Sequence, residues 1–260
     1  LNMICGLDSN DNTTVDNNSE DYLSGIDSGI EGKKIGIIKE MIADGTDPAV
    51  LSSTKDAISK LESLGAICEE ISIDMVKYSV AAYYTITATE AGSNLARYDN
   101  LRYGYDFPVE GYEFNSYIAK ARKNFGPEVT RRMIIGGFVP SAGHAGKYFL
   151  KAMKVKSKLT KEVNEAFKKF DLLIAPTVPI LPFKLGEKID DPVSLFLVDI
   201  NTVTANLTGK PAISVPFAIS NGLPIGMQLF ANSMNDKLLL QAAHALENTV
   251  KLPEVPIWQK

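Results

Sequence analysis

Residues 170–187 read FDLLIAPTVPILPFKLGE, and residues 197–231 read LVDINTVTANLTGKPAISVPFAISNGLPIGMQLFA. Three runs in these segments are apolar enough to be buried strands: DLLIAPT, AISVPFAI and PIGMQLFA. The pair Asn221–Gly222 between the last two runs is typical of a tight hairpin turn. An apolar helical stretch with one acid, Asp199, lies between the first run and the second. This part of the chain is therefore expected to form a strand-rich wall of a pocket.

A second strand pattern lies nearer the start of the chain. Residues 33–40 read KKIGIIKE, a helical pattern with Asp47 or Ser52 as its cap follows, and residues 66–72 read AICEEIS. A strand, a crossover helix and a second strand predict a βαβ unit with parallel strands. The chain then turns mostly helical over residues 73–169. The predicted helices there span residues 113–124, 127–140 and 146–169, and a final helix spans about 236–249.

These patterns predict an α/β fold, with a mixed β-sheet and helices on both faces. We expect one domain of four successive segments: an entry-helix end and surface loop at 1–32, the βαβ unit at 33–72, the helical segment at 73–169, and the strand-rich pocket wall with the final helix at 170–260. Leu1 is not a methionine, and LNMICG is typical of the last turn of an apolar helix. We therefore expect a fragment whose fold is incomplete at its N-terminal side.

The composition is that of an ordinary soluble protein, with 45% hydrophobic residues, 22% charged residues and a formal net charge of −4. A chain with this charge is not expected to bind nucleic acid over its whole surface. The lysine-rich segment 147–169 is either a local basic strip or a solvated helix face, and the second interpretation is favoured. No apolar run is long enough to span a membrane and no signal peptide is recognisable, so a cytoplasmic location is expected.

No catalytic residue and no metal ligand can be assigned from generic motifs. Cys5 and Cys68 lack metal-ligand spacing and, with only two histidines in the chain, give no credible zinc set. The pair Ser52–Ser53 fits a helix cap or a helix face better than a nucleophile. Ser141 precedes Ala-Gly-His, but a nucleophile elbow requires glycine two residues before the serine, where this chain has valine.

Three residues are better candidates for binding a ligand. Arg132, the second of an arginine pair that precedes a Gly-Gly turn, offers a planar fork for a carboxylate; alternatively, one arginine of the pair only neutralises Glu128. Asp199 lies among apolar residues and needs a cation or several donors, although a cap or a backbone hydrogen bond is an equal alternative. Tyr83 offers an aromatic wall with a hydroxyl tip, or core packing. Arginine, aspartate and tyrosine together would suit a zwitterion such as an amino acid.

Several blocks of the chain resemble one known family. YYTITATEAGSNLARYDNLRYG, GPEVTRRMIIGGF, VDINTVTANLTGKPAISVPF and NGLPIGMQL are similar to the A subunits of glutamyl-tRNA(Gln) amidotransferases, which belong to the amidase-signature family. The resemblance runs over essentially the whole chain. It implies an amidase-signature fold, of which this chain is the C-terminal portion. It also implies that Tyr83, Arg132 and Asp199 occupy the glutamine-binding positions of the family.

The resemblance further implies a function in protein synthesis. Such subunits hydrolyse glutamine and pass ammonia to a B subunit, often with a small C subunit, which uses ATP and Mg²⁺ to convert Glu-tRNA(Gln) to Gln-tRNA(Gln). The glutaminase subunit itself needs no cofactor, contacts tRNA only through the complex, and has no membrane partner. The family's Ser–cis-Ser–Lys triad has no counterpart here, so the isolated chain is expected to be inactive. The alternatives are a stand-alone amidase of the same family and a non-catalytic scaffold.

Overall fold

The computed structural model describes residues 1–16, 20–42, 45–101, 103–104, 108, 110–141, 143–187 and 192–252. The chain divides into two compact units. One consists of Leu1–Lys77 together with Lys158–Lys260 and contains the β-sheet. The other, Tyr78–Ser157, is helical. No helix among the described residues is long and apolar enough to cross a membrane. The end of the predicted pocket-wall segment, residues 253–260, lies outside the described residues.

The sheet has five strands in the order β2-β1-β3-β5-β4. β1 pairs in parallel with β2 and β3, whereas β5 pairs antiparallel with β3 and β4. The predicted mixed sheet is thereby confirmed. The strands are β1 (Lys34–Ile38), β2 (Ile67–Ile71), β3 (Leu172–Pro176), β4 (Ala212–Ser220) and β5 (Leu223–Ala231).

The helix between β1 and β2 begins where the sequence predicts. α1 spans Pro48–Ser63, and the carboxylate of Asp47 accepts a hydrogen bond of 2.7 Å from the backbone N–H of Ala49. Because this contact satisfies an amide at the open helix end, Asp47 and not Ser52 is the cap. Gly65 follows the helix with a φ of +87°, a conformation that glycine adopts without strain.

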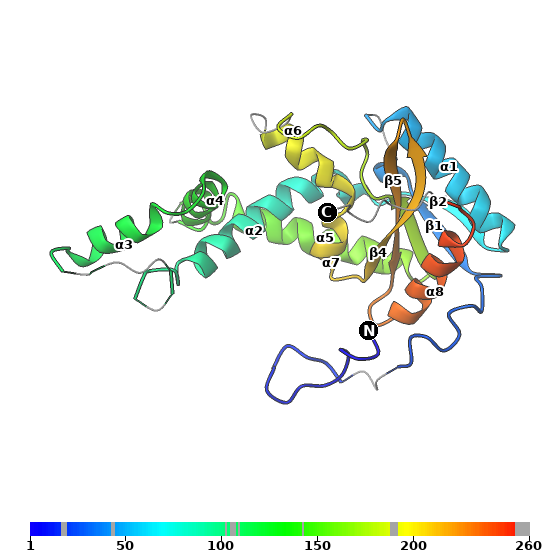
Figure 1. The fold of residues 1–260 in the computed structure, drawn as a ribbon, viewed down its shortest axis with the longest axis horizontal. Coiled ribbons are helices and arrows are strands. Elements are labelled where there is room, and N and C mark those ends of the chain that lie inside the picture. Colours follow the sequence, from blue (N-terminus) through cyan, green and yellow to red (C-terminus); the bar gives the residue numbers. More distant parts are fainter. Residues whose placement is uncertain are drawn as a thin grey trace, which may run out of the picture. The chain divides into compact units, whose positions relative to one another are not determined.

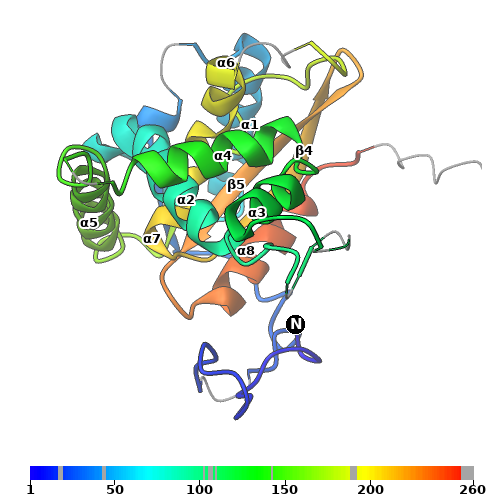
Figure 2. The same cartoon turned by 90° about the vertical axis from the view of Figure 1, so that its left-hand side faces the viewer.

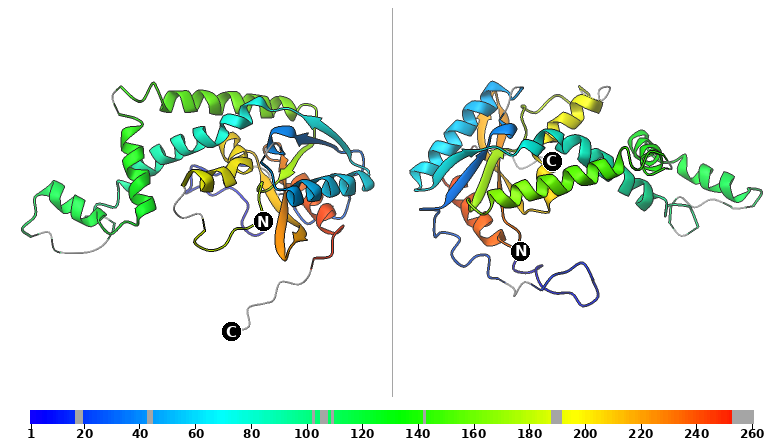
Figure 3. Two further views of the ribbon diagram at one scale, coloured as in Figure 1. Left: turned by 90° about the horizontal axis from the view of Figure 1, so that it is seen from above. Right: turned by 180° about the vertical axis from the view of Figure 1, so that it is seen from behind.

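The two faces of the sheet are covered by different elements. Alternate residues of each strand point to opposite faces, and Ile35, Ile174 and Leu229 belong to a buried core shared with α1 and α8 (Asp236–Glu247). Figure 1 shows α1 and α8 on one side of the strands and α7 (Val203–Thr208) on the other, and Figure 3 shows the same arrangement from behind. Helices therefore cover both faces, as predicted.

The hairpin of β4 and β5 forms at the predicted turn. Asn221 and Gly222 have φ values of 52° and 77°, which are the two positive angles of a tight hairpin turn. A bulge between Pro216 and Ala218 shifts the register of β4 against β5. Proline lacks an N–H for the ladder, and such irregularities are where a strand accepts it.

The helical unit follows the predicted pattern, with one exception. Its helices are α2 (Ser79–Leu95), α3 (Phe114–Arg122), α4 (Pro127–Phe138) and the first part of α5 (Phe149–Ala166). The predicted Gly-Gly turn is wrong, because Gly136 and Gly137 lie inside α4. The apolar helix predicted around Asp199 is broken instead into α6 (Pro192–Leu197), the 3-10 turn η3 (Val198–Asn201) and α7.

Candidate functional site

Arg132 lies on α4 with its Nε edge occupied. Nε donates a hydrogen bond of 2.7 Å to Oε1 of Glu128, one helical turn earlier. The other oxygen of Glu128 accepts from Nε of Arg131 at 3.0 Å and also contacts Nη2 of Arg131. Both arginines therefore share one carboxylate, whereas the alternative derived from the sequence had only one of them pairing with Glu128. Their donors hold the pKa of Glu128 below its usual range, so the carboxylate stays charged at neutral pH and is protonated only as the pH falls through that lowered value.

The terminal nitrogens of Arg132 point to a use beyond the ion pair. Among the described residues, Nη1 and Nη2 of Arg132 have no hydrogen-bonding partner, and the side chain is 40% exposed. The hydrogen bond to Glu128 raises the pKa of Arg132, against an opposing effect of burial, and Tyr84 and Tyr83 add to the rise. Glu128 thus orients the guanidinium while the edge that can grip a carboxylate with two parallel donors stays accessible.

Tyr83 lies near Arg132 because α2 and α4 pack closely. A methyl group built on Gly136 would lie 2.2 Å from the carbonyl oxygen of Ala88 and 3.0 Å from Cα of Gly92, so the two backbones meet without side chains between them. Figure 2 shows α4 crossing α2. The rings of Tyr83 and Tyr84 meet edge-on, with their centres 5.3 Å apart. Two of the three predicted ligand-binding residues, Tyr83 and Arg132, are therefore held on facing helices.

Asp199 belongs to the other compact unit. It lies in η3 and is half-buried, and its backbone carbonyl accepts hydrogen bonds of 3.0 Å from both the N–H and the hydroxyl of Thr202. These bonds close the turn that presents the aspartate. The sequence also allowed a cap or a backbone hydrogen bond for Asp199. Its backbone carbonyl closes this turn, and the role of its carboxylate stays a prediction.

A buried polar network fixes the turn that carries Asp199. The side chain of Asn201 is fully buried, and its Nδ2 donates to the carbonyls of Met41 at 3.2 Å and Pro176 at 2.9 Å. The backbone carbonyl of Asn201 in turn accepts a bond of 3.1 Å from Nε2 of Gln228 on β5. The turn is thereby tied to β3, to β5 and to the chain just after β1. Neither Asn201 nor Gln228 was identified from the sequence.

We expect Asn201→Ala to destabilise the protein by about 2–4 kcal/mol, because two buried carbonyls lose their shared donor and a small cavity opens. Chemical denaturation measures the change. Asn206→Ala is the matched control: this asparagine also donates to a backbone carbonyl, that of Thr202 at 3.1 Å, but it does so at the exposed surface. Its loss is expected to cost less than about 0.5 kcal/mol. Equal losses in the two variants would contradict the anchoring role of Asn201.

The serines considered as nucleophiles, and also His244, have structural surroundings. Ser53 is buried within α1. The hydroxyl of Ser141 donates 2.6 Å to the carbonyl of Phe138, at the end of α4. Nε2 of His244 lies 3.0 Å from a carboxylate oxygen of Asp27. None of these contacts pairs a nucleophile with a base, and no metal-binding cluster occurs among the described residues.

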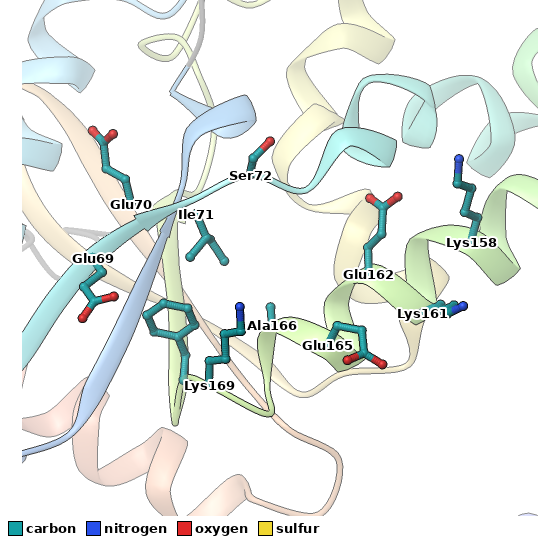
Figure 4. Close-up of a pocket in the computed structure, with 11 residues that line it drawn as sticks. Glu69, Glu70, Ile71, Ser72, Lys158, Lys161, Glu162, Glu165, Ala166 and Lys169 are labelled. Atoms are coloured by element: carbon teal, nitrogen blue, oxygen red, sulfur yellow. The ribbon is translucent and has the colours of Figure 1, made fainter.

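A hollow of about 710 Å³ lies between β2 and the last turns of α5 (Figure 4). Its lining includes the apolar side chains of Ile71 and Phe170 as well as Lys169. Glu162, which lines the hollow, accepts a hydrogen bond of 3.0 Å from the backbone N–H of Met75 and so holds the segment that follows β2. The hollow contains none of the three predicted ligand-binding residues, and its size alone does not make it the functional site.

The comparisons with known proteins cover nearly the whole chain. The model of the family described as Amidase matches residues 1–240. The A subunit of glutamyl-tRNA(Gln) amidotransferase of Cenarchaeum symbiosum is 61% identical over 259 residues, which are 100% of this chain and 54% of that protein. The corresponding protein of Methanosarcina mazei is 43% identical, over 98% of this chain and 54% of that protein. The chain thus spans about half the length of the curated relatives it matches.

Solved structures agree with the predicted fold class. The crystal structure of the A subunit of glutamyl-tRNA(Gln) amidotransferase from Thermotoga maritima has a TM-score of 0.69 and 37% identity, covering 94% of this chain and 48% of that one. A bacterial aryl acylamidase of the amidase-signature family, 21% identical, has a TM-score of 0.71 with the same coverage. At that identity the second likeness concerns the fold alone. The predicted amidase-signature α/β fold is confirmed.

Proposed function

The chain belongs to the amidase family, and from this premise we propose that it forms the glutamine-binding part of the A subunit of a tRNA-dependent amidotransferase. The observation that carries the proposal is the orientation and exposure of the Arg132 guanidinium. Its guanidinium is oriented by Glu128, lies close to Tyr83 and Tyr84, and has an accessible edge of two donors, in a chain 61% identical to such a subunit. An oriented guanidinium with an open edge is suited to binding a carboxylate.

The ligand that suits these residues is free glutamine. Its α-carboxylate would take the terminal nitrogens of Arg132, its ammonium group would take the carboxylate of Asp199, and the Tyr83 hydroxyl would supply a further hydrogen bond. Opposite charges on the ligand call for opposite charges in the site, which explains why one arginine and one aspartate are needed. A substrate that lacks either charged group would leave one of them without a partner and bind more weakly.

In the proposed complex, the bound glutamine loses its side-chain amide as ammonia. The family's Ser–cis-Ser–Lys triad would carry out the hydrolysis, and a partner B subunit, with a small C subunit, would use the ammonia, ATP and Mg²⁺ to amidate Glu-tRNA(Gln). No stretch of these 260 residues resembles the segment that carries the triad. The role proposed for this chain is therefore to select and orient glutamine, and the isolated chain is expected to release no ammonia.

Asp199→Asn in the full-length subunit, assembled with its partners, tests the proposal. The change keeps the size of the side chain and removes its charge, so we expect the KM for glutamine to rise about 10-fold or more. Amidation of Glu-tRNA(Gln) with added ammonium chloride should be unchanged, because free ammonia bypasses the glutamine site. Production of Gln-tRNA(Gln) with each nitrogen donor is the measurement.

Asp56→Asn is the control, because Asp56 is an exposed carboxylate on α1. It should change neither the glutamine-dependent nor the ammonia-dependent reaction. A complex that hydrolyses simple amides without tRNA, and whose KM is indifferent to Asp199→Asn, would support a stand-alone amidase instead. A complex with no glutamine-dependent ammonia release at all would support a scaffold.

A further inference from the structure

The helical unit contains a second, smaller pocket that the proposed glutamine site does not use. Its volume is about 200 Å³, and it lies between the start of α2 and the start of α5. Its floor is apolar, and its rim carries the aromatic rings of Tyr78 and Tyr148. The lining residues are Tyr78, Ala81, Ala82, Thr85, Lys147, Tyr148, Lys151, Ala152 and Val155.

The charge around this pocket is of one sign. Among the described residues that line it, none is acidic, although the chain as a whole has a formal net charge of −4. Lys147 and Lys151 are exposed on its rim, and Lys154, also exposed, lies one turn further along α5. Lys151 and Lys154, three residues apart, share one face of α5, and with Lys147 just before the helix they form a short positive stripe beside the pocket. The stripe favours an anionic ligand that is longer than the pocket itself.

The aromatic side chains of the rim are accessible. Tyr78 is 50% exposed and Tyr148 is 38% exposed, both high for large rings. Nζ of Lys147 lies 5.4 Å from the centre of the Tyr148 ring, which places a positive charge beside a flat aromatic face. A planar ring that carries a phosphate would find a stacking surface and a cation together here.

We propose that this pocket binds an unpaired nucleotide of an RNA. The base would lie against Tyr148 and Tyr78 over the alanine floor, and neighbouring phosphates would lie along Lys147, Lys151 and Lys154. A pocket of about 200 Å³ accommodates one flat base, whereas an acidic peptide would need a longer groove for its successive side chains. The proposal rests on the proposed function only in taking the RNA to be the tRNA on which the complex acts. It departs from what the resemblance implies, since this chain would then contact the tRNA directly and not only through the complex.

The test is a binding titration on the complete complex. Fluorescently labelled tRNA(Gln) transcript is titrated with wild-type complex and with a Lys147→Ala/Lys151→Ala variant, and anisotropy gives Kd at several salt concentrations. We expect Kd to rise about 10-fold and the slope of log Kd against log salt to fall by about 1–2, because two phosphate contacts are lost. The matched control is Lys55→Ala/Lys60→Ala, which removes two exposed lysines from α1. It should leave both quantities unchanged.

A second pair of variants separates stacking from charge. Tyr148→Ala should weaken RNA binding about 10-fold, whereas Tyr148→Phe, which keeps the ring, should bind as wild type does. Unchanged Kd in the lysine variant, or equal losses in the α1 control, would overturn the proposal. Loss of partner subunits from the purified lysine variant would also overturn it and identify a protein-docking face. Glutamine-dependent ammonia release should stay normal in every variant, so failure here is distinguishable from failure of the proposed glutamine site.

Discussion

Arg132→Ala is expected to raise the KM for glutamine about 100-fold in the full-length subunit, with little change in kcat. The carboxylate contact would be made equally in the bound substrate and in the transition state, so its loss weakens binding and leaves the chemical step alone. Truncating one member of a charge-assisted pair costs about 2–5 kcal/mol, which corresponds to roughly 30- to 5,000-fold in affinity. Partial exposure of Arg132 places the expected effect in the lower part of that range.

Arg131→Ala is the matched control. Both arginines pair with Glu128, so either substitution removes one ion pair from the same carboxylate. Only Arg132 is expected to contact glutamine, and Arg131→Ala should therefore change the KM less than about threefold. Steady-state kinetics of ammonia release measure both variants. A similar rise in the two would show that the arginines act on the helix and not on the ligand.

The second large effect is expected from Gly136→Ala. The added methyl would lie 2.2 Å from the carbonyl oxygen of Ala88, and a backbone atom of a packed helix cannot move aside cheaply. α2 and α4 must separate, at a cost of about 3 kcal/mol or more. Tyr83 should move away from Arg132 as a result. We expect a clear fall in thermal unfolding temperature together with a raised KM for glutamine.

For the neighbouring Gly137, we expect substitution by alanine to change the stability in the opposite direction. Gly137 lies in the same helix, but a methyl built on it has no atom of the described residues within 4 Å beyond its chain neighbours and its own helix backbone. Gly137→Ala should therefore be stabilising by up to about 1 kcal/mol, because alanine loses less entropy in a helix. Unfolding temperatures that move in the same direction for the two variants would contradict the close approach of α2 and α4.

Local patterns made most of the fold predictable. The strand runs and the Asn221–Gly222 turn depend on residues adjacent in sequence, and both appear where they were predicted. The helix cap is Asp47, one of the two residues predicted for it. The pairing of Glu128 with the arginines is similarly local, because residues three and four apart meet on a helix. The sequence indicated, as an alternative, that one of the two arginines pairs with Glu128. That one carboxylate would hold both guanidinium groups depended on side-chain geometry that the spacing alone does not give.

Contacts between distant residues were not predictable in the same way. Glycine pairs usually break helices, which is why the sequence predicts a turn at Gly136. The close approach of Ala88 and Gly92 on another helix explains why a glycine lies inside α4 instead. Asn201 is similarly unremarkable in sequence. Its importance comes from Pro176 and Gln228, which are 25 and 27 residues away and meet it only in the folded sheet.

The pairing of β1 with β3 has a consequence for how the chain folds. The backbone N–H of Lys34 bonds to the carboxylate of Asp171 at 2.8 Å, across 137 residues of sequence. The whole helical unit therefore lies within a loop that these neighbouring strands close. β1 and β2 can pair early, but β3 can join them only after the loop-closure entropy of that long excursion has been overcome. Sheet completion is thus a late, non-local step, and we expect the sheet-containing unit to acquire its final strands more slowly than the helices between them form.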